Sequence, residues 1–326
     1  MPGLVRKAAA WLGAILLLAG IAAYAGWRDY TQPGPLAAAK IIVIPKGSGL
    51  HQVASLLAEG GIIDNRWIFI AETFFSGRGH SLRAGEYEFA AAISPRAAAD
   101  LIDSGKVVRH KLTIPEGLTT AEIVALIDAA PALEGAIEAE PLEGTLLPDT
   151  YFYVLGNTRT ELLSRMHHAM ERALAEAWAH RAPDLPLPSP AAAMTLASIV
   201  EKETARPEER ARIAGVYIER LKLGMKLQAD PTVIYVLTKG GVQPLNRPLT
   251  HDDLSVPSPY NTYAEKGLPP TPIANPGLAA LRAALQPDDR GELYFVADGS
   301  GGHAFAKTLE EHNRNVAKLR SEQGGG

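Results

Sequence analysis

The hydrophobic pattern of the chain begins with one long uncharged segment. Residues 8–27 contain no charged side chain. As an α-helix this segment would be about 30 Å long, which matches the hydrocarbon core of a bilayer. The pattern therefore predicts a transmembrane helix at 8–27, with a short N-terminus at 1–7 before it and a linker at 28–39 after it. A cleaved signal peptide is the alternative, although its apolar region is usually only about 7–15 residues long.

The charges that flank this segment predict its orientation. Arg6 and Lys7 precede it, whereas Arg28 and Asp29, which follow it, cancel each other. Basic residues concentrate on the cytoplasmic side of membrane helices. We therefore expect residues 1–7 in the cytoplasm and everything after the helix on the other side of the membrane.

Beyond the linker, a strand, a turn with Pro and Gly, and an amphipathic helix occur twice in the same order. The strands are predicted at 41–44 and 110–114. The apolar positions of the two helices have the same spacing, namely Val53, Leu56 and Leu57 in the first and Ile123, Leu126 and Ile127 in the second. We expect an α+β fold with a small module at 40–108 and a second α+β module with a connecting helix at 109–182. Two related copies and two independent units both fit, because strand-turn-helix is a common pattern.

The last domain is expected at 183–326, where a segment rich in proline precedes a helix. Residues 183–190 contain four prolines, which favours a stiff loop. Ser189 followed by Pro190 is typical of a helix start, with serine as the N-cap and proline at the first helical position. The helix should end before Pro207, because residues that precede proline disfavour helical backbone.

Two glutamates near the end of this helix are predicted to differ. Glu203 follows the aliphatic positions Leu196, Ile199 and Val200 by seven, four and three residues, so it shares their face. Glu201 lies on a more polar face. A carboxyl group in an apolar cleft is kept protonated by desolvation, so Glu203 is a candidate general acid. The alternative is that both glutamates are solvated, as is usual for this residue type.

Composition excludes several classes of function. The chain has 326 residues, 32 basic and 36 acidic side chains and a net charge of -4, which argues against a nucleic-acid partner. The absence of cysteine excludes a disulfide framework, a thiol nucleophile and a cysteine-ligated zinc site. The histidines at 167, 168, 303 and 312 do not have metal-ligand spacing. We therefore expect no cofactor and no metal.

A series of short motifs follows in a fixed order along the chain. They are Arg83-Ala84-Gly85-Glu86-Tyr87, the segment 143–153, the stretch 197–204 with Glu201-Lys202-Glu203-Thr204, and the segments 227–235, 258–263, 267–270, 294–299 and 302–305. Together with the single N-terminal anchor, this order resembles the MltG (YceG-like) family of endolytic murein transglycosylases. The resemblance covers nearly the whole chain. It implies a LysM-like module at 40–108 and a mixed α/β catalytic domain at 183–326.

The resemblance also implies the chemistry. Glu203 matches the family's catalytic glutamate, which would protonate the β-1,4 bond between N-acetylmuramic acid and N-acetylglucosamine inside a nascent peptidoglycan strand. The same group would then act as a base on the C6 hydroxyl of the muramic acid and leave a 1,6-anhydro end. An intramolecular nucleophile of this kind needs no second carboxylate, since its effective concentration is high.

Polar and aromatic side chains of two segments are the expected substrate-binding residues, because they suit hydrogen bonds to sugars and stacking on pyranose rings. They are Gln228, Asp230, Thr232, Tyr235, Tyr260, Asn261, Thr262 and Tyr263. The partners implied by the resemblance are peptidoglycan strands, the inner membrane and peptidoglycan synthases (penicillin-binding proteins). The catalytic domain would then be periplasmic.

Two other functions stay open at the level of sequence. One is a non-catalytic scaffold that binds peptidoglycan. The other is a hydrolytic muramidase, in which water replaces the C6 hydroxyl and Asp149, Asp230 or Asp252 supplies a second carboxylate.

Overall fold

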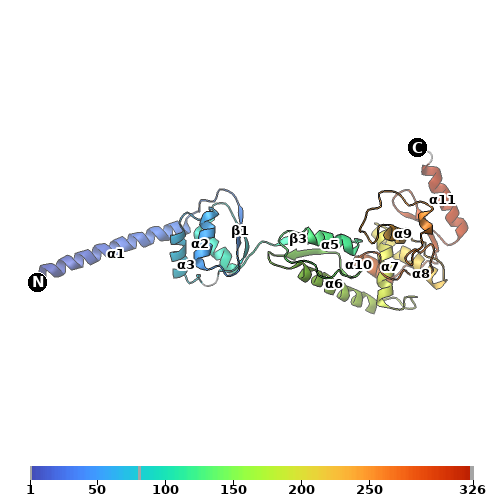
Figure 1. The fold of residues 1–326 in the computed structure, drawn as a ribbon, viewed down its shortest axis with the longest axis horizontal. Coiled ribbons are helices and arrows are strands. Elements are labelled where there is room, and N and C mark those ends of the chain that lie inside the picture. The colour runs from blue at the N-terminus through green and yellow to red at the C-terminus, as the bar shows by residue number, and fades with distance from the viewer. Residues whose placement is uncertain (1, 80–81, 324–326) are drawn as a thin grey trace. The chain divides into compact units, whose positions relative to one another are not determined.

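The computed structural model describes residues 2–79 and 82–323, which form two compact units (Figure 1). Unit 1 comprises Met1–His110 with Tyr153–Gly156, and unit 2 comprises Lys111–Phe152 with Asn157–Gly326. Met1, at the start of the predicted cytoplasmic N-terminus, and the glycines at 324–326, at the end of the predicted last domain, lie outside the described residues.

The first helix, α1 (Pro2–Thr31), includes a segment at Arg6–Thr31 that is long and apolar enough to cross a membrane. The helix continues four residues beyond the predicted end at Trp27. Its Tyr30 is 3% exposed, and its hydroxyl is 3.2 Å from the hydroxyl of Thr73. Leu36 is also buried in unit 1. Residues 28–39, which the sequence predicts to be a linker, therefore contribute to the core of unit 1, because Tyr30 and Leu36 bury apolar surface there.

Unit 1 is a small α+β module, as the sequence predicts for this region. Strands β1 (Lys40–Ile44) and β2 (Gly85–Phe89) pair antiparallel, and helices α2 (Leu50–Glu59), α3 (Arg66–Phe75) and α4 (Pro95–Ser104) bury their apolar faces in one core with them. Ser94 caps α4 by accepting a hydrogen bond from the backbone of Ala97, and the left-handed Gly105 ends this helix. The LysM-like character of the module stays a prediction.

The second predicted strand-turn-helix is also present. Strands β3 (His110–Thr113) and β4 (Thr150–Tyr153) form a two-stranded sheet, and the helices are α5 (Thr120–Asp128) and α6 (Arg159–Ala179). Both helices begin with a capping box. In α5, Thr119 and Glu122 exchange hydrogen bonds between side chain and backbone, which satisfies amide groups that a helix start leaves free.

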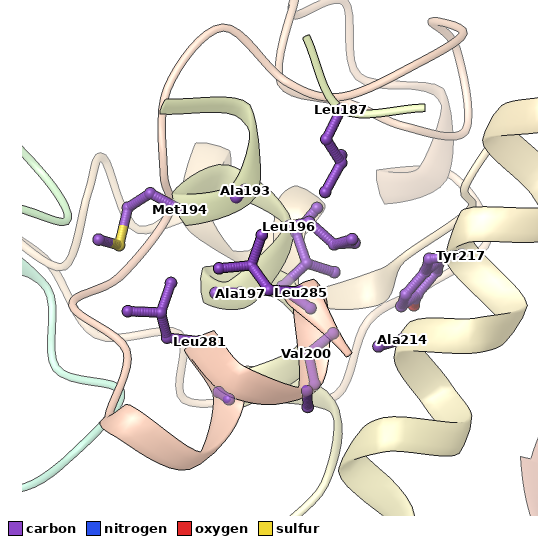
Figure 2. Close-up of a cluster of buried hydrophobic side chains, with 14 of the residues drawn as sticks. Leu187, Ala193, Met194, Leu196, Ala197, Val200, Ala214, Tyr217, Leu281 and Leu285 are labelled. Carbon is purple, nitrogen blue, oxygen red and sulfur yellow. The ribbon is translucent and has the colours of Figure 1, made fainter. Parts of the chain in front are cut away.

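The core of unit 2 is built around α7 (Pro190–Glu203), whose residues 193–200 are all buried. Ser189 caps this helix and Pro190 opens it, as predicted. Helices α8 (Arg210–Lys222) and α10 (Leu278–Leu285) pack against it, and Figure 2 shows Val200, Ala214 and Leu285 within this cluster. Unit 2 also contains helix α9 (Asp230–Leu237) and the 3₁₀ turns Pro207–Glu209 and Asp253–Ser255. The rest is the predicted terminal hairpin, β5 (Tyr294–Ala297) with β6 (His303–Ala306), followed by α11 (Leu309–Gln323).

Candidate active site

Glu203 is the last residue of α7 and lines a cavity of about 320 Å³ in unit 2. The walls come from α8, from the segment before α9, from the loop that contains Tyr263, and from the terminal hairpin. The side chains that line it are Glu203, Tyr217, Arg220, Leu227, Gln228, Asp230, Tyr263, Phe295, Val296, Ala297 and His303. Helix α7 thus buries its aliphatic face in the core, and its last residue, Glu203, places its side-chain carboxyl group in this cavity.

The surroundings of Glu203 favour the protonated carboxyl group. Burial raises the pKa of Glu203 to about 7, and the negative charge of Asp230 acts in the same direction. The hydrogen bond from Tyr217 and the positive charge of Arg220 oppose this rise in pKa. A carboxyl group with a pKa near neutrality can donate a proton and take one back, which is what general acid–base catalysis requires.

Tyr217 and Arg220, both from α8, are themselves fixed. The Tyr217 hydroxyl donates to Oε1 of Glu203 at 2.5 Å, and burial raises the pKa of Tyr217 well above its ordinary value. Tyr217 therefore remains a hydrogen-bond donor at all physiological pH values. Arg220 donates through Nε to the carbonyl of Leu293 at 2.7 Å and through Nη1 to the carbonyl of Leu227 at 2.6 Å. These bonds tie the helix to the hairpin and to the segment before α9.

Three predicted substrate-binding residues lie on this cavity. The Tyr263 hydroxyl donates to Oδ1 of Asp230 at 2.5 Å, which joins the two predicted segments at the site. Gln228 has a left-handed backbone with φ of 52°, a conformation that costs a residue other than glycine about 1–2 kcal/mol. Its backbone amide donates to the carbonyl of Thr262 at 3.1 Å. Strained backbone of this kind is typical of functional sites.

Three other predicted residues are buried behind the cavity wall. Thr232, Asn261 and Thr262 are at most 1% exposed. The hydroxyls of Thr232 and Thr262 are 3.0 Å apart, and Asn261 accepts from the backbone of Tyr263 at 2.9 Å. The structure thus gives these side chains partners within the protein, because buried polar groups need hydrogen bonds. They position Tyr263 and the start of α9 and do not line the cavity.

The remaining two predicted residues lie in a different cluster. The Tyr235 hydroxyl donates to Oε2 of Glu143 at 3.3 Å, and the Tyr260 hydroxyl is 2.7 Å from that of Thr271. The two tyrosine rings contact each other with centroids 5.2 Å apart. Neither ring lines the cavity that contains Glu203.

Glu201 forms hydrogen bonds with groups of the protein and does not line the cavity. Its Oε1 accepts from Arg210 at 3.1 Å, and its Oε2 accepts from the backbone amide of Gly277 at 2.9 Å. The side chain is 5% exposed, and burial raises the pKa of Glu201, while the bond from Gly277 and the charge of Arg210 oppose that rise. The two glutamates therefore differ, since Glu201 pairs with polar groups inside the protein and Glu203 lines the cavity. The cavity is not the apolar cleft that the sequence predicts, because Arg220, Asp230 and other polar side chains also line it.

Sequence reasoning did not assign His303, Tyr217 or Arg220 to the site. His303 lines the cavity, and its Nδ1 is 2.6 Å from Oε2 of Glu209. The backbone amide of His303 also donates to Oε1 of Glu209 at 3.0 Å, so one carboxylate fixes both the ring and the start of β6. The signal available in the sequence was the motif 302–305, which contains this histidine.

The structure also places the candidate second carboxylates. Asp230 lines the cavity with Glu203, Asp149 lines a separate cavity along α6 and α10, and Asp252 is exposed. Among residues 2–79 and 82–323, no group of three or more His, Cys, Asp or Glu side chains could hold a metal ion.

Comparisons with known proteins agree on one family. The sequence model of the YceG-like family matches residues 42–318. The chain is 30% identical over 313 residues to the endolytic murein transglycosylase of Bacillus subtilis strain 168, covering 86% of this chain and 85% of that protein. It is 28% identical over 325 residues to the endolytic murein transglycosylase of Streptococcus pneumoniae D39, and spans 57% of that longer protein. A crystal structure of a YceG-like protein from Listeria monocytogenes matches with a TM-score of 0.53 and 32% identity, over 85% of this chain and 98% of that one.

Proposed function

The chain belongs to the YceG-like family, and from this premise we propose that it is an endolytic murein transglycosylase with Glu203 as its catalytic residue. The observation that carries the proposal is the position of Glu203, the one glutamate among the described residues that line the cavity, where burial raises its pKa to about 7. Polar and aromatic side chains of the kinds that bind sugars line the same cavity. One carboxyl group is sufficient when the substrate supplies its own nucleophile.

In the proposed reaction, Glu203 first donates its proton to the glycosidic oxygen between N-acetylmuramic acid and N-acetylglucosamine. The bond from C1 of the muramic acid to that oxygen breaks, and the N-acetylglucosamine leaves with a hydroxyl group. The carboxylate of Glu203 then removes the proton from the C6 hydroxyl, and the C6 oxygen forms a new bond to C1. The product is a 1,6-anhydro end, Glu203 is protonated again, and no water is consumed.

The neighbouring groups support both halves of this cycle. Before the first proton transfer, burial and the charge of Asp230 favour the protonated form of Glu203. As positive charge develops at C1, the Asp230 carboxylate on the same cavity stabilises it. After the transfer, the hydrogen bond from Tyr217 stabilises the Glu203 carboxylate. Tyr263 and Phe295 line the same cavity and supply aromatic side chains for contact with the sugars.

A hydrolytic muramidase is the second candidate, and the position of Asp230 on the cavity is the observation that favours it. In that reaction Asp230 would activate a water molecule. Mass spectrometry of peptidoglycan digested by the purified protein separates the outcomes. We expect products with anhydro ends. A hydrolase would give products with reducing ends instead. The absence of any product would instead favour a scaffold that only binds peptidoglycan.

Glycan strands acetylated at C6 of the muramic acid provide a further test. The acetyl group blocks the internal nucleophile but leaves the glycosidic bond unchanged. Since a well-placed internal nucleophile is worth about 7–11 kcal/mol, we expect these strands to resist cleavage. Equal cleavage of both kinds of strand would reject the internal attack and retain Glu203 as a general acid.

We further propose that α1 anchors the protein in the inner membrane with a cytoplasmic N-terminus, so that units 1 and 2 are periplasmic and can act near peptidoglycan synthases. The length and apolar composition of Arg6–Thr31 and the basic Arg6 and Lys7 support this orientation. Protease added to the outside of spheroplasts should digest both units. Protection of both units would reverse the orientation, and recovery of a soluble form without α1 would favour the signal peptide.

A further inference from the structure

Helix α3 of unit 1 has a buried face and, opposite to it, an exposed apolar face. Phe69 and Thr73 on one face are fully buried in the core. On the other face, Trp67, Phe74 and Phe75 are 60%, 59% and 83% exposed, and the small Ala71 completes a stripe at the helical spacing of four, seven and eight residues. Contiguous exposed apolar patches on a protein surface commonly mark sites that contact a membrane or another molecule. Three exposed aromatic rings on one short helix therefore indicate a surface that another phase or molecule covers.

The position of α3 places this helix beside the end of α1. Its buried face holds the end of α1, since Tyr30 contacts Thr73 through its hydroxyl and Phe69 through its ring, with centroids 6.3 Å apart. A side chain added at Gly26 would lie 3.5 Å from the carboxylate of Glu72. Residues 26–30 are where the uncharged segment of α1 ends. Figure 1 shows α3 at the end of unit 1 that α1 enters.

We propose that the aromatic stripe of α3, defined by Trp67, Ala71, Phe74 and Phe75, docks on the headgroup region of the bilayer that α1 spans. The contacts of Tyr30 and the proximity of Glu72 to Gly26 place α3 at the level where α1 leaves the hydrocarbon core. Tryptophan and phenylalanine rings are favourable at this depth. The inference rests on the proposed membrane anchor and extends it from one helix to a surface.

A cation accompanies the stripe at its start. The guanidinium of Arg66 lies 4.8 Å from the centroid of the Trp67 ring. A long basic side chain beside an interfacial ring can reach lipid phosphates while its stem covers apolar surface. Docking would hold unit 1 against the membrane and restrict the tilt of α1 together with unit 1, because Tyr30 joins the two in one core.

The test uses the absence of cysteine from the chain. A fluorescent label is attached to Phe75→Cys in the full chain, reconstituted in vesicles of phosphatidylethanolamine and phosphatidylglycerol. The matched control is Val43→Cys, an exposed apolar position of β1, which Figure 1 shows at the opposite end of unit 1 from α1. Quenching is measured with aqueous iodide and with a spin-labelled lipid. Circular dichroism checks that both variants fold, as expected for exposed positions.

We expect the Phe75→Cys label to be quenched several-fold more by the lipid probe, and several-fold less by iodide, than the Val43→Cys label. Adding Trp67→Ser and Phe74→Ser should restore iodide quenching. Equal iodide quenching at the two positions would overturn the docking surface while co-flotation with vesicles retains the anchor. A label shielded from iodide but insensitive to the lipid probe would overturn it in favour of contact with a second copy of this chain. Failure to co-float would overturn the anchor and the docking together, without bearing on cleavage by Glu203.

Discussion

The Tyr217 hydroxyl donates a 2.5 Å hydrogen bond to the carboxyl group of Glu203, from a helix that follows Glu203 in the chain. This bond opposes the effect of burial, which raises the pKa of Glu203 to about 7. The cavity thus contains a carboxyl group poised between two protonation states. Its partner Tyr217 is too deeply buried to ionise in the same range of pH.

The first prediction separates the two glutamates of α7. Glu203→Gln keeps the size of the side chain but cannot transfer a proton, so we expect cleavage of peptidoglycan to fall below detection. Glu201→Gln should retain most activity, because Glu201 contacts Arg210 and Gly277 and does not line the cavity. It should lower the free energy of unfolding by about 1–3 kcal/mol through the weakened buried ion pair. Activity assays and thermal unfolding of both variants provide the check, and the reverse ranking of activities would refute the assignment.

The second prediction concerns stability and pH. The pKa of Glu203 is about 7 in the folded protein against an ordinary value of 4.5, so the folded state binds the proton more tightly. This contribution to stability is complete below pH 4.5 and is lost as the pH rises through about 7. Glu203→Gln should therefore be as stable as the unchanged protein in acid and more stable at pH above 7, by about 3 kcal/mol. Denaturant unfolding at several pH values measures the difference, and a gap that does not depend on pH would contradict it.

The third prediction addresses His303. Glu209 holds both the ring and the backbone of His303 at the cavity wall. Burial raises the pKa of Glu209, but the hydrogen bonds from His303 outweigh it and hold that pKa below its ordinary value, so Glu209 is a carboxylate at neutral pH. Glu209→Ala should lower kcat/KM about tenfold, equivalent to about 1.4 kcal/mol, by releasing His303 and the hairpin. The exposed neighbour Glu208 gives the control, since Glu208→Ala should leave kcat/KM unchanged. If the two variants have equal effects on kcat/KM, the position of His303 does not matter for activity.

Spacing in the sequence predicts which glutamate enters the cavity, because helical periodicity alone places Glu203 on the aliphatic face. It does not predict Tyr217 or Arg220, since their approach depends on how α8 packs against α7. Thr232, Asn261 and Thr262 resemble sugar-binding residues in sequence. Their side chains instead satisfy buried backbone and hydroxyl groups, a requirement that only the tertiary structure reveals.

For unit 1, the sequence also predicts residues 28–39 only in part. Proline and glycine at 33–35 correctly indicate irregular backbone, but composition does not reveal that Tyr30 and Leu36, on either side, are buried. The fourth prediction follows. A chain that begins at Lys40 lacks both side chains, so its unit 1 should lose about 3 kcal/mol or more of stability relative to a chain that begins at Arg28. Hydrogen exchange should rise in α3 and α4, while unit 2 gives the internal control. Equal protection of unit 1 in both chains would show that this burial contributes little.

The last prediction uses two neighbours of Glu203 that act on its pKa in opposite directions. The hydrogen bond from Tyr217 lowers this pKa, so Tyr217→Phe should raise it, whereas the charge of Asp230 raises it, so Asp230→Asn should lower it. Asparagine still offers an oxygen to the Tyr263 hydroxyl, which preserves the geometry of the cavity wall. If the protonated form of Glu203 starts the reaction, kcat/KM declines on the basic side with this pKa. That limb should move to higher pH in Tyr217→Phe and to lower pH in Asp230→Asn, whatever the loss in absolute rate. If the basic limb moves in the same direction in the two variants, or moves in neither, another group controls this limb.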